Sequence, residues 1–195
     1  MSKGIKSLLI VIGIIIVVFI FLVVPLKNLY NNLVHLDENV NNSWAQVENQ
    51  LQRRYDLIPN LVETVKGYAS HEREVLTEVT QARASVGSAK TPNEVMQANN
   101  DLTNALSRLL VVVERYPDLK ADQRFKDLQI ELAGTENRIA VERRRYNEAV
   151  RTFNQKVRSF PTNMIAGMFG FEKRAYFEAP EAAKVAPKVD FGTSK

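Results

Sequence analysis

The first feature of the hydrophobic pattern is an apolar segment near the start of the chain. Residues 7–26, between Lys6 and Lys27, carry no formal charge and are mostly Ile, Val, Leu and Phe. As a helix rising about 1.5 Å per residue, this segment is about 30 Å long, the thickness of a bilayer's hydrocarbon core. A cleaved signal peptide would have a shorter apolar run followed by small residues, and residues 23–26 contain no such cleavage site. The segment therefore predicts one retained transmembrane helix.

Positive charges flank this segment unequally. Lys3 and Lys6 precede it, whereas Lys27 is the only basic residue on the other side before Arg53, which is beyond the usual window of about 15–20 residues. This asymmetry predicts a cytoplasmic N-terminus over residues 1–6, a single span of the cytoplasmic (inner) membrane and a C-terminal domain outside the cytoplasm. Without the three flanking lysines, 23 basic side chains face 22 acidic ones with the signs interleaved, which argues against nucleic acid as a partner.

Beyond the membrane segment, apolar residues recur at alternating spacings of three and four, the period of an amphipathic helix. The pattern predicts one helix over residues 28–86, with Gly87 placed to end it and Glu72 as the one polar member of the stripe. Pro59 lies inside this helix. A new helix beginning there would have Ile58 as its N-cap, a poor capping residue, so a kink in one continuous helix is the favoured interpretation.

Three further helices are predicted after it. Thr91-Pro92-Asn93-Glu94 is a capping box that begins a helix over residues 92–116. Others follow over residues 119–160 and 162–170, and the Ala, Lys, Glu and Pro composition of residues 179–195 indicates a flexible tail. No strand-like alternation occurs in the sequence. The predicted fold class is all-α: a transmembrane helix that continues into a long antiparallel helical bundle over residues 27–178.

The predicted lengths suggest that part of the first helix lacks cover. Residues 28–86 would span about 90 Å, whereas residues 92–116 span about 37 Å and residues 119–160, about 60 Å long, would run away from the membrane. An uncovered apolar stripe often marks an interaction surface, which predicts a homo-oligomer. The alternative is that Pro59 bends the helix enough for it to pack on itself. The candidate self-association residues are Leu29, Leu33, Leu36, Val40, Trp44 and Val47.

The sequence offers little to a catalytic or metal site. The chain has no cysteine, and neither His35 nor His71 belongs to a Glu-x-x-His or His-Glu-x-x-His pattern. No serine lies in a Gly-x-Ser-x-Gly turn. His71 lies in a run, residues 70–73, that faintly resembles the phosphoacceptor box of sensor kinases, but a glycine-rich ATP-binding domain is missing. We therefore expect no catalytic residue, no metal, no cofactor and no enzyme activity.

Polar residues near the helix stripes form a separate group. They lie around Pro59 and, at repeated seven-residue intervals, along the helix predicted over residues 119–160. Such groups can form buried hydrogen-bonded pairs that fix helix register, and a ligand site is the alternative. The candidates are Arg54, Asp56, Asn60, Glu136, Arg143, Asn147 and Asn154.

Several motifs occur in order along the chain and together resemble the LemA family. They are Trp44-Ala45-Gln46-Val47-Glu48, the run of residues 53–61 (RRYDLIPNL), Tyr116-Pro117-Asp118-Leu119, Glu136-Asn137-Arg138-Ile139, Arg144-Arg145-Tyr146-Asn147, Phe160-Pro161 and Tyr176-Phe177-Glu178. The resemblance implies a membrane-anchored helical bundle in a bacterium, without an established enzyme activity. We therefore expect a scaffold or organiser at the bacterial envelope, with the lipid bilayer and further copies as partners. The alternative is a module that binds another envelope protein, or signals, through the Pro59 region or residues 164–171.

Overall fold

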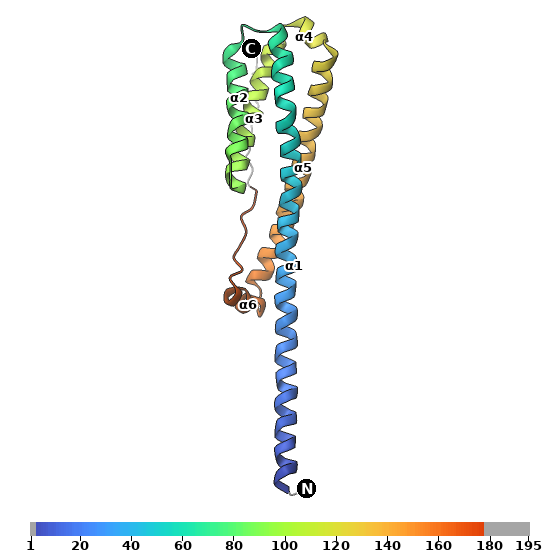
Figure 1. Cartoon of the computed structure of the whole chain (residues 1–195), viewed down its shortest axis with the longest axis vertical. Coiled ribbons are helices and arrows are strands. Elements are labelled where there is room, and N and C mark those ends of the chain that lie inside the picture. The colour runs from blue at the N-terminus through green and yellow to red at the C-terminus, as the bar shows by residue number, and fades with distance from the viewer. Residues whose placement is uncertain (1–2, 178–195) are drawn as a thin grey trace, which may run out of the picture. The chain divides into compact units, whose positions relative to one another are not determined.

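The computed structural model describes residues 3–177, apart from the side chains of residues 3, 5–10, 15, 18, 20 and 22. Every regular element among them is a helix, as the sequence predicts (Figure 1). The helices are α1 (Lys3–Tyr68), α2 (Arg73–Ser88), α3 (Pro92–Val113), α4 (Pro117–Ala121), α5 (Gln123–Arg158) and α6 (Thr162–Phe169). The described residues form two compact units: the first unit is residues 3–45 with 145–176, and the second unit is residues 46–144 with 177. The predicted tail, residues 179–195, lies outside the described residues.

The predicted transmembrane helix is not supported by the described residues. Within that part of the chain, no helix combines the length and the apolar character needed to cross a membrane. The side chains of eight of the twenty residues in the predicted span are outside the described set: 7–10, 15, 18, 20 and 22.

The second unit is an antiparallel arrangement of helices around one hydrophobic core. Tyr68, at the end of α1, donates a hydrogen bond of 2.9 Å to Asp122, just before α5, and Arg54 of α1 pairs with Glu136 of α5. Residues that lie later in α1 therefore face earlier residues of α5. The core combines side chains from α1 to α5: Ile58, Leu61, Val65, Ala69, Leu76, Val79, Leu102, Ala105, Leu106, Leu109, Val113, Leu119 and Phe125.

The helix predicted over residues 28–86 is wrong at its end, because α1 stops at Tyr68 and the chain turns before α2. Ala69 is fully buried, and Glu72 closes the turn by donating its backbone N–H to Ala69 O at 3.1 Å. The Glu72 carboxylate accepts hydrogen bonds from Arg115 and from the Tyr116 hydroxyl, both at 3.0 Å. The polar exception in the apolar stripe is therefore the residue that fixes the turn.

At Pro59, the continuous-helix interpretation is confirmed, because α1 runs through this residue. Proline has no N–H, so it cannot donate to the carbonyl of Tyr55, four residues earlier. Arg83 of α2 supplies the missing donor: its Nε lies 3.1 Å from Tyr55 O, and its guanidinium stacks 3.7 Å from the centroid of the Tyr55 ring. Gly87 does not end a helix as predicted. It lies within α2, where an added Cβ would come within 3.3 Å of the Tyr55 ring.

The later helices follow the predicted boundaries more closely. The capping box at Thr91 is confirmed, with the Thr91 hydroxyl accepting from Glu94 N–H at 3.2 Å. The helix predicted over residues 119–160 is two elements, α4 and α5, separated at Asp122. The Asp122 carboxylate accepts the Phe125 N–H at 2.9 Å and so caps α5. This hydrogen bond is the main cause of the lowered pKa of Asp122.

The first unit overturns the premise of an uncovered stripe on α1. Leu33 and Val40 are only 0% and 2% exposed, and the Trp44 ring lies 5.4 Å from the Tyr146 ring of α5. Of the other candidate residues, Leu29, Leu36 and Trp44 are half-buried, and Val47, in the second unit, is fully buried. The expected lack of cover is wrong because the turn at residues 69–72 adds a helix, whereas the homo-oligomer itself stays a prediction. The extra reversal makes α5 antiparallel to α1, so α5 covers the stripe instead of running away from it.

The Arg83 contact predicts that the stability lost on replacing Arg83 depends on whether position 59 is proline. Arg83→Met should lower the free energy of unfolding by about 1–2 kcal/mol, since a part-buried carbonyl loses a charged donor. In a Pro59→Ala background the same substitution should cost less, because position 59 then has a backbone N–H that can donate to Tyr55 O. Urea unfolding of the four variants gives the coupling energy. Equal costs in both backgrounds would show that Arg83 does not replace the bond that proline removes.

Candidate functional site

The structure divides the seven predicted polar residues among three places. Arg54, Glu136 and Arg143 are in the second unit, where Arg54 and Glu136 form an ion pair. Asn147 and Asn154 are on the part of α5 that belongs to the first unit. Asp56 and Asn60 are exposed on α1, and Asp56 accepts a hydrogen bond of 2.9 Å from Gln52 of the same helix. The seven residues of the predicted network therefore belong partly to each unit, and two of them lie on an exposed face of α1.

Arg54 is the most deeply buried charged residue of this set. It is 4% exposed, its Nη1 donates to Asn99 Oδ1 at 3.0 Å, and it forms the ion pair with Glu136. Asn99 of α3 is itself 2% exposed and was missed in the sequence. A signal existed, because Asn99 lies four residues after Val95 and three before Leu102, on the apolar stripe of its helix. A polar residue at such a position faces the core and needs a partner.

One carboxylate balances two guanidinium groups in this cluster. Burial lowers the pKa of Arg54, and the charge of Glu136 partly opposes that effect. The pKa of Arg143 is lowered for the same reason and is likewise opposed by Glu136. The Arg143 guanidinium also stacks 3.8 Å from the centroid of the Phe177 ring. Arg54 of α1 therefore joins α3 through Asn99 and α5 through the partly exposed Glu136.

A cavity of about 270 Å³ adjoins the Arg54–Glu136 pair. Its walls are mainly apolar, and Thr103 and Ser107 also line it, with their hydroxyls donating to backbone carbonyls of α3; the apolar residues are Leu61, Leu106, Leu110, Leu132 and Ala133. Arg54 Nε is buried and has no hydrogen-bond partner among the described residues. The arrangement suits an apolar group with a polar end, rather than a reaction that needs a nucleophile and a base.

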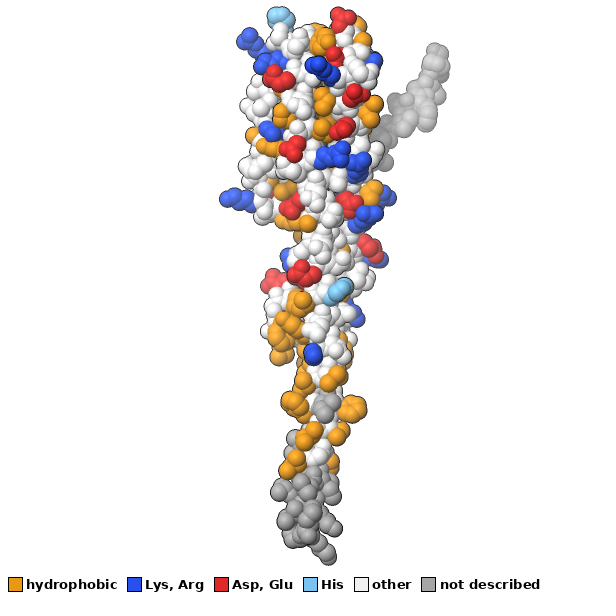
Figure 2. All heavy atoms as spheres, turned by 45° about the vertical axis from the view of Figure 1, so that its right-hand side comes forward, with side chains coloured by type: hydrophobic (Ala, Val, Ile, Leu, Met, Phe, Trp, Pro, Cys, Tyr) orange, Lys and Arg blue, Asp and Glu red, His pale blue; other side chains and the backbone are white. Residues whose placement is uncertain are grey.

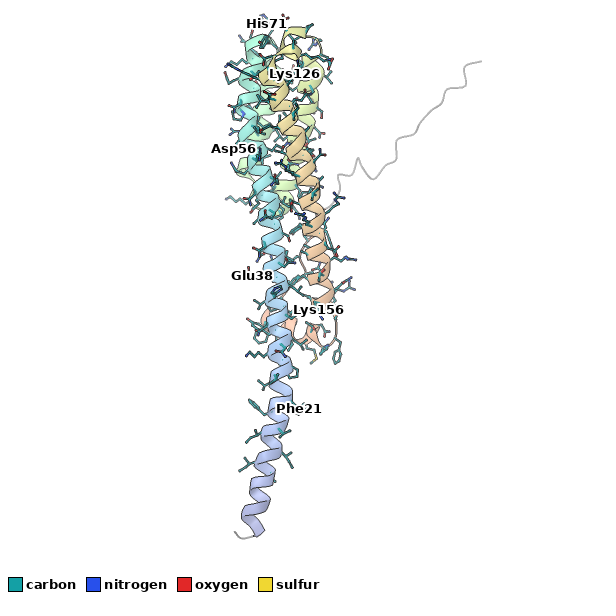
Figure 3. All side chains as sticks on the ribbon, turned by 90° about the vertical axis from the view of Figure 1, so that its right-hand side faces the viewer. Phe21, Glu38, Asp56, His71, Lys126 and Lys156 are labelled. Atoms are coloured by element: carbon teal, nitrogen blue, oxygen red, sulfur yellow. The ribbon has the colours of Figure 1, made fainter. Side chains whose placement is uncertain are left out.

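The two histidines lie away from this cavity. His35 and His71 are both exposed, and Figure 3 shows His71 at the turn between α1 and α2. Within residues 3–177, no group of three or more His, Cys, Asp and Glu side chains could hold a metal ion. We therefore place no chemical step at either histidine.

The polar residues of the first unit connect α5, the chain after α6 and α1 by hydrogen bonds. The Asn154 side chain binds the backbone of Arg174 in both directions, donating to Arg174 O and accepting from Arg174 N, each at 2.9 Å. The Arg174 guanidinium reaches Asp37 of α1, with an Nη2–Oδ1 distance of 2.9 Å. Tyr146 adds a hydrogen bond of 3.1 Å to Ala175 O. Asn154 was predicted as a polar contact, whereas Asp37 and Arg174 carried no signal in the periodicity.

Removing the acid of the buried pair should destabilise the protein strongly. Glu136→Leu leaves a guanidinium that cannot deprotonate, with Asn99 as its remaining side-chain acceptor. We expect the free energy of unfolding to fall by an amount near the lower end of about 3–5 kcal/mol, because the Glu136 side chain is itself 43% exposed. The combined change Arg54→Met, Asn99→Leu and Glu136→Leu should recover most of it. Urea unfolding of the full chain in detergent measures both, and a neutral Glu136→Leu would contradict the pairing.

Comparison with known proteins identifies the family to which this arrangement belongs. Similar proteins include Magnetosome protein MamQ 2 of Paramagnetospirillum magneticum (27% identical over 179 residues) and Magnetosome protein MamQ of Magnetospirillum gryphiswaldense (24% over 179 residues). Protein LemA of Metamycoplasma hominis is 27% identical over 172 residues. Each magnetosome match covers 78% of this chain and 66% of the relative, and the LemA match covers 86% and 76%. The chain thus spans just under two thirds of the magnetosome relatives.

The model of the LemA family matches residues 43–191. This region contains all of the second unit that the structure describes and the parts of α5 and α6 that cover α1 in the first unit. Because the match extends over more than half of the chain, the protein belongs to the LemA family.

Proposed function

We propose that this protein is a membrane-associated, non-enzymatic helical protein that organises other components at the bacterial envelope, with residues 7–26 of α1 in the lipid bilayer. The observation that carries the proposal is the exposure of this part of α1. All twelve residues whose exposure the structure describes between positions 11 and 26 are exposed. Phe19 and Phe21, for example, are 63% and 76% exposed.

The exposed surface is suited to lipid rather than to water. Removing one large apolar side chain from water is worth about 1.5–3 kcal/mol, and ten are exposed here: Val11, Ile12, Ile14, Ile16, Val17, Phe19, Phe21, Val23, Val24 and Leu26. Figure 2 shows hydrophobic side chains along this narrow part of α1. No charged residue occurs between Lys6 and Lys27, so the whole surface can enter hydrocarbon. The lysine asymmetry supports a single-pass orientation with residues 1–6 in the cytoplasm.

The organising role is supported by the relatives and by the kind of site that the chain contains. The magnetosome proteins are named for a cellular structure and not for a reaction. The polar clusters around Arg54 in the second unit and Asn154 in the first unit each hold together segments that are distant in the sequence. An organiser needs stable contacts of this kind rather than a catalytic constellation.

Binding of another protein, or of a second copy, is a second candidate function. The cavity in the second unit favours it, because Leu110 in its wall is 37% exposed and is followed by Val111, which is 72% exposed. Ile130, next to the cavity residue Gln129, is 70% exposed. A contact between copies would therefore use α3 and α5 rather than the stripe of α1, which is covered in its own chain.

Charges in the apolar segment should release the protein from the membrane. Ile14→Arg with Val17→Arg should shift the full chain into the soluble fraction, since each arginine at the bilayer centre costs about 2.5–3.5 kcal/mol. Val34→Arg, at an exposed apolar position later in α1, is the matched control and should stay membrane-bound. A wild-type protein that washes off membranes at high pH would contradict the proposal.

The orientation of the protein in the membrane can be tested separately from its membrane association. A reporter that is active only outside the cytoplasm, fused after Lys195, should be active because Lys3 and Lys6 hold the N-terminus inside. Activity of a cytoplasm-dependent reporter at the same point would show the opposite orientation without contradicting the membrane association.

The assembly state is testable at α3. Val111→Glu should lower the native mass of the protein in detergent if copies meet there, and the fold should persist because the side chain is exposed. Thr77→Glu, at an exposed polar position on α2, should leave the mass unchanged. A strictly monomeric wild type would contradict self-association and leave partner binding as the second candidate.

A further inference from the structure

The short helix α6 is apolar on two faces, and only one of them is covered. Thr162, Ile165 and Ala166 form its buried face within the first unit. The other side carries large apolar side chains with high exposure: Met164 at 61%, Met168 at 77%, Phe169 at 57% and, just before the helix, Phe160 at 82%. A helix that is apolar all round is usually buried all round. An uncovered patch of this kind marks contact with another protein or with a membrane.

The position of α6 along α1 favours contact with a membrane over contact with another protein. The Phe169 ring lies 4.7 Å from the ring of Tyr30, and the Phe171 ring lies 5.9 Å from it, so α6 packs beside this part of α1 (Figure 1). Tyr30 follows Leu26, the last residue of the apolar segment, by four residues, which is about 6 Å along a helix. The exposed patch of α6 therefore lies beside the end of the segment that would occupy the bilayer.

The charges around α6 suit an anionic lipid surface. Residues 156–176 contain four basic residues and one acidic residue, a net charge of +3. One of the four, Arg174, pairs with Asp37 of α1. Long basic side chains next to apolar ones are typical of segments that lie at the interface, where the cation reaches lipid phosphates.

We infer that α6 is a second membrane contact, lying in the plane of the bilayer surface with Phe160, Met164 and Met168 in the interfacial region. This inference rests on the proposed function, in which residues 7–26 cross the bilayer. An interfacial helix buries its apolar face about 5–10 Å into the boundary between headgroups and acyl chains. Since Asn154, Arg174 and Asp37 tie the chain around α6 to α1, the contact fixes the rotation and tilt of α1 in the membrane.

The absence of cysteine from the sequence makes a site-specific test possible. Met168→Cys, Phe21→Cys and Asn42→Cys each give the full chain one thiol for an environment-sensitive fluorophore. Phe21 lies in the apolar segment (Figure 3), and Asn42 is exposed on α1 about 24 Å beyond Leu26. The labelled proteins are placed in phosphatidylglycerol vesicles whose lipids carry a quencher at the top of the acyl chain.

Quenching at Met168 and Phe21, with none at Asn42, is the expected result. A Met164→Glu change should then reduce quenching at Met168 and leave quenching at Phe21 unaltered. Quenching at Phe21 without quenching at Met168 would overturn the inference for α6 and leave the proposed function intact. Absence of quenching at both positions would instead contradict the proposed function itself. Equal quenching at Met168 and Asn42 would also overturn the inference, because the label would then not report the level of α6.

Discussion

The constraint on which the rest of the structure depends is that α1 carries an apolar stripe longer than any neighbouring helix, and this stripe has to be covered. The turn at residues 69–72 makes that possible, because it reverses the chain once more than a single long helix would. With α2 going back and α3 returning, α5 runs antiparallel to α1. The pairs Arg54–Glu136 in the second unit and Trp44–Tyr146 in the first unit follow from this direction.

Periodicity predicted the all-helical class, and the residue types at capping positions predicted the capping box at Thr91 and the passage of α1 through Pro59, because each depends on residues close in sequence. It missed the turn because Tyr68, Glu72 and Val75 keep the helical spacing across it. A turn that preserves the helical spacing of apolar residues cannot be detected from that spacing alone. One missed reversal then changes the direction of every later helix, which is how covered residues such as Leu33 and Val40 were interpreted as an interface.

The partners of the buried polar residues could not be predicted from the spacing either. The stripe indicates that a residue such as Asn99 or Arg54 faces inward, but not which side chain meets it. Arg54 and Asn99 are 45 residues apart, so their contact depends on the register between helices. Pro59 illustrates the same point from the backbone. The missing donor is a local property of the sequence, whereas its replacement by Arg83 is a property of the packed bundle. Because the stripe is covered, the exposed apolar surfaces that remain for partners include residues of α3, α5 and α6.

The central claim, that α1 is covered in the first unit by its own chain, is tested most directly by a cross-link. Asp37→Cys and Arg174→Cys replace two residues whose side chains meet at 2.9 Å, in a protein that has no other cysteine. A short bis-maleimide added to membranes that contain this variant should join the two sites within one chain, and denaturing electrophoresis should show the product as a monomer. Covalent dimers would show that another copy covers this part of α1, and no cross-link would show that the two sites do not lie side by side in one chain.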